Sequence, residues 1–312
     1  LFVVDGVPIY EQQRGNESSV FNGESYLNPL SNINPDDIKS ISILKDATAS
    51  SLYGANGANG VIIITTKSGE AGKTNINFSF DSGVASFINE YQWLTGPEYH
   101  SLLREAYING RTTSVTEATR LAGSNTVNTD WFDLTQRNAV YQNAGLDISG
   151  GANKTTFRVS AGYRNQEASS FKNDLQKFYT RFRLDHEFND KFKVGLNISP
   201  TFTKSNALSN YGAVLLPPNL APYTDGTFTD FLGVPNPLAV LEQNENSNKG
   251  VQFIANLNAS YKVNNEISIS GTFGADSYQN KQTQYLSALN ATGRTANGNL
   301  RIYDRTYMSY IG

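Results

Sequence analysis

The sequence predicts part of a membrane-spanning antiparallel β-barrel, seven to eight strands of it, preceded by a small α/β unit. Apolar and polar residues alternate with period two from residue 74 onward, in segments of about ten residues or more. The connections between these segments are alternately short and long, as in outer-membrane barrels. Phe and Tyr recur near the segment ends, where such barrels carry aromatic girdles.

The first 70 residues predict a small mixed α/β unit. Residues 1–10 (LFVVDGVPIY) read as a strand with a turn at Asp5-Gly6, and residues 36–44 and 61–66 as two further strands. Between them, Asp46 is placed to cap a short helix over residues 47–53, which Gly54 would end. Such a unit is too small for us to expect it to be stable alone.

The glycine-rich run that follows this helix does not predict a nucleotide site. A phosphate-binding loop needs a glycine five residues before Gly72-Lys73-Thr74, and that position is Lys67. Residues 74–87 alternate as a strand does, where the motif requires a helix. The glycines at 54, 57 and 60 precede a strand, whereas the dinucleotide motif follows one.

Eight segments of the remaining chain are predicted to be strands: residues 76–84, 140–148, 157–163, 178–188, 192–202, 251–261, 267–273 and 300–311. Short connections are expected at residues 150–154, 189–191 and 263–265. Long ones are expected at 88–138, 166–176, 205–249 and 279–299. In a barrel this order places every long loop at one end of the sheet. A soluble sandwich has no reason to do so.

Composition excludes several functional classes. The 312 residues contain no Cys, which removes thiol catalysis and disulfides, and His100 and His186 are not at metal-ligand spacing. The net charge is −3 and the Lys and Arg residues are scattered, so nucleic acid is not an expected partner. No cofactor or metal is expected. The chain starts within a strand and without Met. We therefore expect it to be a fragment of a longer protein, without that protein's beginning.

Two stretches resemble a known family. The runs LFVVDGVPIY (1–10) and NPDDIKSISILKDATASSLYGANGANGVIIITTKSG (34–69) resemble the plug-domain signature of SusC/RagA-type TonB-dependent outer-membrane transporters. The segments 128–134 and 146–171 resemble the first barrel strands of that family. The signature positions matched here are Asp5, Gly6, Lys45, Asp46, Tyr53, Gly54, Gly57, Asn59 and Gly60.

The resemblance implies an architecture. Residues 1–72 would be the C-terminal part of a plug inside the lumen, and residues 73–312 the first strands of a barrel of about 22. Residues 69–73 would form the hinge between them. The segment that binds TonB and the remaining strands would lie outside this chain.

The resemblance also implies a function. The protein would import an oligosaccharide or a peptide across the bacterial outer membrane, without catalysing a reaction. TonB would supply energy from the periplasm, a SusD-like surface lipoprotein would close the barrel as a lid, and outer-membrane lipid would surround it.

Candidate ligand contacts follow from this architecture. Gln12, Arg14, Asn16 and Glu17 lie in a plug loop that would face the outer mouth. Arg181 and Arg183, like Arg158 and Arg164, are candidates to line the substrate path. We favour the simpler interpretation that these arginines pair with Asp185, Glu187 and plug carboxylates inside the lumen.

The aromatic residues of the first long loop allow two interpretations. Trp93 and Trp131, with Tyr91, Tyr99 and Tyr107, could contact a sugar or the lid. We favour an amphipathic helix over residues 94–108 whose aromatic side chains pack on the barrel.

The main alternative is a surface glycan-binding or adhesion β-sandwich without transport, and an enzyme comes third because no motif places a pair of carboxylates. The strand at 177–188 separates barrel from sandwich. In a barrel Phe178, Phe182, Leu184 and Phe188 face outward and are accessible on the bare protein. Arg181, Arg183, Asp185 and Glu187 are then enclosed.

Overall fold

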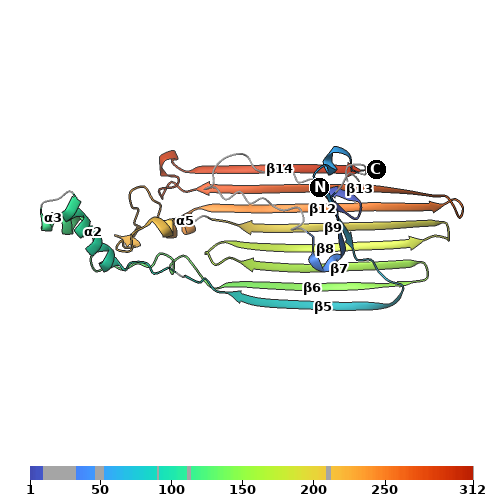
Figure 1. Ribbon diagram of the computed structural model, residues 1–312, viewed down its shortest axis with the longest axis horizontal. Coiled ribbons are helices and arrows are strands. Elements are labelled where there is room, and N and C mark those ends of the chain that lie inside the picture. Colours follow the sequence, from blue (N-terminus) through green and yellow to red (C-terminus); the bar gives the residue numbers. More distant parts are fainter. Residues whose placement is uncertain (10–32, 46–52, 90, 111–113, 209–211, 312) are drawn as a thin grey trace.

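The structure, a computed structural model, describes residues 1–9, 33–45, 53–89, 91–110, 114–208 and 212–311. An eight-stranded antiparallel sheet forms most of it, and a four-stranded sheet lies against one face (Figure 1). We call that face the wall, and the described residues up to Thr66 the N-terminal unit. Asp46, the helix predicted at 47–53, and the candidate contacts Gln12, Arg14, Asn16 and Glu17 lie outside the described residues.

The large sheet is a meander in which each strand pairs with its neighbours in the chain. Its strands are β5 (Gly72–Ala85), β6 (Ala139–Ala152), β7 (Thr155–Glu167), β8 (Asp174–Glu187), β9 (Phe192–Asn206), β12 (Glu245–Lys262), β13 (Ser268–Leu286) and β14 (Asn299–Ile311). All eight predicted strands are present. This agrees with the first strands of an antiparallel barrel.

Two strands are longer than the sequence predicted. β12 begins at Glu245 and β13 extends to Leu286, because the ladder between them continues to the pair Glu245–Tyr285. Residues 245–250 and 279–284 are polar on both faces, so no alternation marked them as strand. The connection between β7 and β8 is only residues 168–173, shorter than expected.

The longer connections emerge at one end of the sheet, opposite the tight turns, as predicted (Figure 1). They carry the elements α2 (Gly96–Gly110), α3 (Val115–Leu121), α4 (Gly212–Leu215), β10 (Tyr223–Thr224), β11 (Thr227–Phe228), α5 (Pro237–Gln243) and η4 (Arg294–Ala296). Side-chain caps start two of these helices: Ser114 accepts from the Glu117 amide, and Asn236 accepts from the Leu238 amide. Among the described residues, no helix combines the length and apolarity needed to cross a membrane.

The small sheet has the order β2-β1-β4-β3, and β1 runs parallel to β4. Its strands are β1 (Phe2–Val4), β2 (Val7–Ile9), β3 (Ile38–Leu44) and β4 (Val61–Thr66), with the 3₁₀ turns η2 (Pro35–Asp37) and η3 (Gly54–Gly57) between them. The strand predicted over residues 1–10 is in fact a hairpin. Asp5 and Gly6 both have positive φ, at 48° and 89°, which gives the two-residue turn that tight hairpins favour.

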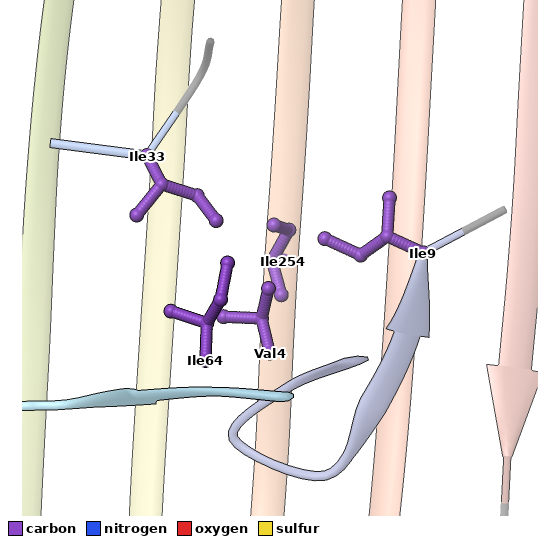
Figure 2. Close-up of a cluster of buried hydrophobic side chains, with 5 residues drawn as sticks. All are labelled: Val4, Ile9, Ile33, Ile64 and Ile254. Atoms are coloured by element: carbon purple, nitrogen blue, oxygen red, sulfur yellow. The ribbon is translucent and has the colours of Figure 1, made fainter. Parts of the chain in front are cut away.

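The core of the N-terminal unit is completed by the wall. Val4, Ile9, Ile33 and Ile64 form one buried cluster together with Ile254 of β12 (Figure 2). Residues that share the face of Ile254 along β12 are mostly polar, so this isoleucine is an apolar exception on that face. Because the small unit has so little apolar volume of its own, burial against Ile254 stabilises both partners.

The two faces of β8 differ as the barrel prediction required. Phe182 is 39% exposed and Phe178 and Phe188 are also exposed, whereas Arg181 on the wall is only 3% exposed. Leu184 is half-buried, and the Glu187 side chain is 47% exposed beside Lys193 near the tight-turn end. Within the described residues, no second sheet covers the outward phenylalanines, which contradicts the sandwich.

We expect Phe182→Arg to cost about 2–4 kcal/mol of folding free energy in a lipid bilayer, because it places a cation on the lipid-facing surface. Urea unfolding of the full-length protein in vesicles measures this. Thr203→Arg, on the opposite face, is the matched control and should cost much less. Equal losses for the two variants would contradict the assignment of the faces.

Candidate functional site

The N-terminal unit meets the wall through buried charges. Asp5 and Asp37 of the unit face Arg181 and Arg183 of β8 and Arg158 of β7. We call these five residues the charged cluster. They include three of the candidate residues from the sequence, Arg158, Arg181 and Arg183, and one signature residue, Asp5.

Asp5 forms most of the polar contacts between the unit and the wall. Within its own unit, its carboxylate accepts hydrogen bonds from the Thr66 amide (2.8 Å) and hydroxyl (2.6 Å). Asn197 Nδ2 of β9 donates to Asp5 Oδ2 at 2.8 Å, and Asn256 Nδ2 of β12 donates to the Asp5 carbonyl at 3.0 Å. The turn between β1 and β2 is therefore bonded to two strands of the wall.

Arg181 lies between the two carboxylates of the N-terminal unit, those of Asp5 and Asp37. Its Nη1 is 3.4 Å from Asp5 Oδ2, and its Nε is 3.7 Å from Asp37 Oδ2. Arg183 lies 4.0 Å from Asp5 Oδ1 and pairs more closely, at 2.8 Å, with Asp185. The expected pairing with carboxylates is confirmed for Arg181 and Arg183. Arg158 pairs instead with Asp147 of the wall, Arg164 Nε donates to Asn143 Oδ1, and Glu187 pairs with Lys193. A buried guanidinium is tolerated only with such compensation.

Asp37 ends η2 and is buried against β7. Asn34 caps this turn by accepting from the Asp36 amide, and Ser160 Oγ of β7 donates to Asp37 Oδ2 at 3.0 Å. Burial raises the pKa of the Asp37 carboxyl, and the Arg181 charge and the Ser160 hydrogen bond only partly oppose this. The cluster therefore contains one carboxylate whose charged form is disfavoured.

The hydrogen bonding of the cluster is incomplete. Within the described residues, the buried atoms Arg181 Nε, Arg158 Nε and Asn197 Oδ1 have no hydrogen-bond partner. Unsatisfied buried polar atoms each cost about 1–3 kcal/mol. The contact is thus specific in its pairing without being as strong as a fully satisfied network.

Glycines allow the close approach of the unit and its linker to the wall. A Cβ at Gly69 would lie 2.3 Å from the Phe157 carbonyl oxygen, and one at Gly274 would lie 2.5 Å from Val7 Cγ2. The linker therefore crosses β7 at a point where only glycine fits. This is a structural reason for one glycine of the run that resembles a phosphate loop.

The remaining signature residues are structural or exposed. Gly54 and Gly60 have positive φ, and Gly57 is buried in η3. Tyr53 packs against the second core cluster, that of Val3 and Val61. Lys45 and Asn59 are exposed.

Two outer loops are joined by a buried tryptophan. Trp131, 3% exposed, donates from Nε1 to the Pro217 carbonyl at 3.1 Å and packs with Leu216. Asn219 Nδ2 donates to the Ala122 carbonyl at 2.7 Å. The connections after β5 and after β9 therefore form one unit at the loop end of the sheet.

The expected packing of the helix at 94–108 on the barrel is wrong. The helix exists as α2, but it lies beyond the strand ends, where it contacts α3 (Figure 1). His100 Nδ1 lies 3.1 Å from the Gly123 carbonyl and ties α2 to the loop after α3. Trp93 precedes α2 and is half exposed. A helical pattern reveals an apolar face but not its partner.

Sequence reasoning missed Asp37, Ser160, Asn197 and Asn256. The signal was available only in part: Asn197 and Asn256 lie on the polar face of their predicted strands. Which polar residues meet the N-terminal unit depends on strand register, which the sequence did not fix. Among the described residues, no three His, Asp or Glu side chains gather as a metal site.

The Asp37 environment predicts a pH dependence. Because the folded-state pKa is raised above 3.8, the contribution of Asp37 to stability is complete below that pH and is lost as pH rises through the raised value. Asp37→Asn removes this titration. Its stability relative to the unchanged protein should therefore rise as pH increases from about 4 to 8.

Urea unfolding of the full-length protein across this pH range checks the prediction. Asp36→Asn, at the exposed neighbouring position, is the control and should keep the pH profile of the unchanged protein. If the difference in unfolding free energy between Asp37→Asn and the unchanged protein does not vary with pH, the pKa of Asp37 is not raised.

Comparison with known proteins agrees with this arrangement. Residues 1–61 match the family model of the TonB-dependent receptor plug domain. The chain is 32% identical over 273 residues to TonB-dependent receptor P26 of Formosa agariphila, covering 83% of this chain and 27% of that relative. It is 26% identical to TonB-dependent receptor SusC of Bacteroides thetaiotaomicron, covering 92% of this chain and 30% of SusC. The chain thus spans less than a third of these relatives' length.

A solved structure shares the fold. The RagAB peptide transporter superposes with a TM-score of 0.78 at 21% identity, over 99% of this chain and 38% of that one. Its likeness concerns the fold alone, and the sequence relatives supply the family. Taken together, the plug match and the related receptors show that the chain belongs to the SusC/RagA-type TonB-dependent receptors.

Proposed function

We propose that the chain is the plug and the first barrel strands of a TonB-dependent importer in the bacterial outer membrane. The observation that carries this proposal is the docking of the N-terminal unit on the polar face of a sheet whose other face is apolar and exposed. We assign residues 1–72 to the plug and residues 73–312 to the barrel, in keeping with the start of β5 at Gly72.

The charged cluster would hold the plug closed. Arg181 of the wall attracts both plug carboxylates, and Asp5 adds hydrogen bonds to β9 and β12. A pull from TonB on the plug would break these contacts. Their incomplete hydrogen bonding suits a contact that must be both specific and reversible, because the charged groups gain water when they separate.

The partners would be TonB in the periplasm and a SusD-like lipoprotein at the loop end. The substrate would be an oligosaccharide or a peptide; the neighbouring RagAB structure is described as a peptide transporter. Gln12, Arg14, Asn16 and Glu17 remain proposed contacts of the plug loop. Arg181 and Arg183 would meet substrate only after the plug carboxylates leave them. Transport makes and breaks no covalent bond, so we assign no catalytic residue.

Uptake in cells tests the proposal. A strain that depends on the full-length receptor should accumulate its nutrient only with intact TonB and an energised inner membrane. Deleting TonB should abolish uptake while nutrient still binds at the surface. Uptake that continues without TonB would overturn the proposed function.

A disulfide between plug and wall should block transport. A Cβ at Gly274 would lie 3.3 Å from Val7 Cβ, near the separation that a disulfide requires, and this chain contributes no cysteine of its own. We expect Val7→Cys with Gly274→Cys to stop uptake under oxidising conditions. A membrane-impermeant reductant should restore it.

The controls are Val7→Cys alone and the double-cysteine variant kept reduced, and both should transport. Normal uptake by the oxidised, cross-linked receptor would show that the hairpin of β1 and β2 need not leave β13.

Removing the charge of Asp5 should weaken plug closure. Asp5→Asn keeps the size of the side chain but loses charge-assisted hydrogen bonds, each worth about 1.5–3 kcal/mol. We expect increased entry of a large antibiotic such as vancomycin through the full-length receptor. Asp36→Asn serves as the control, and equal leakage for both variants would contradict a specific role of Asp5.

A further inference from the structure

An exposed row of aromatic side chains lies on the first long connection. Tyr91 and Trp93 are 76% and 50% exposed, and Phe87, two residues beyond β5, is 41% exposed. Phe132, from the far end of the same connection, joins them. We call these four residues the aromatic row. Exposed apolar groups that cluster in this way mark binding sites more often than single ones do.

Successive rings of the row contact one another, two pairs stacked and one pair tilted. The ring centroids of Phe87 and Phe132 are 6.1 Å apart with an interplanar angle of 8°. Those of Phe132 and Trp93 are 5.2 Å apart at 22°, and those of Trp93 and Tyr91 are 5.7 Å apart at 49°. These separations are those of offset pairs. Much of the surface of Phe87, Tyr91 and Trp93 is uncovered, whereas Phe132 is half-buried between its neighbours.

Neighbouring polar groups hold the row in place. Asn89 Oδ1 accepts from the Trp93 Nε1 (3.3 Å) and from the Tyr91 amide (3.2 Å), which fixes the turn between them. Asp130 Oδ1 accepts from the Phe132 amide at 3.0 Å. Trp131, which lies between these two residues in the chain, is buried between the two outer loops. The row is therefore supported before any ligand arrives, which lowers the entropy cost of binding.

The charge around the row argues against anionic partners. Along the chain, residues 74–103 contain no Lys or Arg, whereas Asp81 and Glu98 supply negative charge. An anionic lipid surface, an acidic sugar or an acidic peptide would need cations at this point. The π face of an aromatic ring is electronegative, and it attracts the polarised C–H bonds on the apolar face of a sugar ring. Asn89, whose Oδ1 contacts Tyr91 and Trp93, also carries an amide NH₂ that can donate to sugar hydroxyls.

We propose that Phe87, Tyr91, Trp93 and Phe132 form a stacking site for the sugar rings of a neutral oligosaccharide at the outer mouth of the receptor. The site collects substrate before the plug opens, so it deepens the proposed import function and rests on it. Trp93 is its central residue, because it contacts both Tyr91 and Phe132 and its indole is oriented by Asn89. Tyr91, the most exposed ring, extends the surface.

Binding to the purified full-length receptor tests the site. The probes are maltohexaose, cellohexaose, laminarihexaose, xylohexaose, a hexameric oligogalacturonate and an uncharged hexapeptide, each measured by calorimetry. We expect at least one neutral hexasaccharide to bind, and Trp93→Ala to weaken it about tenfold or more. Tyr91→Ala should weaken it less.

The control is Tyr261→Ala, an exposed tyrosine at the tight-turn end of β12, which should leave the affinity unchanged. Trp93→Phe keeps an aromatic face and should retain most of the affinity. Circular dichroism of each variant establishes that it is folded.

Several outcomes overturn the stacking site. One is a receptor that binds none of the neutral sugars, and another is a sugar affinity that Trp93→Ala leaves unchanged. A variant that loses only the SusD-like lipoprotein, or only the hexapeptide, would assign the row to that partner instead. None of these outcomes touches TonB-dependent uptake, which is measured separately in cells. Loss of TonB dependence with intact sugar binding would overturn the import function and not the site.

Discussion

The pairing of two buried plug carboxylates with Arg181 is the interaction on which the rest of this structure depends. The N-terminal unit has too little apolar core to be stable alone, and its main cluster closes only with Ile254 of the wall. Apolar contact at one isoleucine cannot fix the orientation of a four-stranded unit. Hydrogen bonds from β7, β9 and β12 to Asp37 and Asp5 do, because they are directional and require specific partners.

The same contact explains how a closed state and an opening step can share one interface. A buried ion pair gains little net free energy, since desolvation offsets much of its attraction. Orphaned atoms at Arg181 and Asn197 lower the net gain further. Glycines at 69 and 274 let the N-terminal unit and its linker approach the wall closely. The two surfaces therefore fit closely, although the ion pairs between them contribute little net free energy. In the proposed import function, an interface with these properties would separate under the pull of TonB and re-form with the same partners.

The opposite end of the sheet has a different design. There a single buried tryptophan, Trp131, joins the connections after β5 and β9, and Phe132 of the aromatic row follows it in the chain. Rigid support under exposed rings is the arrangement expected of a binding surface, not of a loop that merely spans two strands. The two parts of the sheet thus have different proposed roles. The loop end would bind the ligand, and the contact between the wall and the plug would control its passage.

The sequence by itself determined the class of fold. Period-two alternation marked all eight strands, and the order of short and long connections placed the long loops at one end, because both are properties of local sequence. The plug motif fixed the family. Strand ends were missed where residues 245–250 and 279–284 are polar on both faces, since alternation then carries no signal.

The charged cluster and the aromatic row were decided by tertiary structure. Alternation identified Arg181 as inward-facing, and the sequence favoured plug carboxylates over substrate as its partners. It did not identify Asp5, 176 residues away, as one of them. Likewise, the pattern around Trp93 predicted a helix packed on the barrel, whereas α2 packs on α3 and leaves the tryptophan exposed. Local sequence fixes which face a side chain occupies. The partner across that face depends on the register and docking of distant segments, which arise only when the whole chain is assembled.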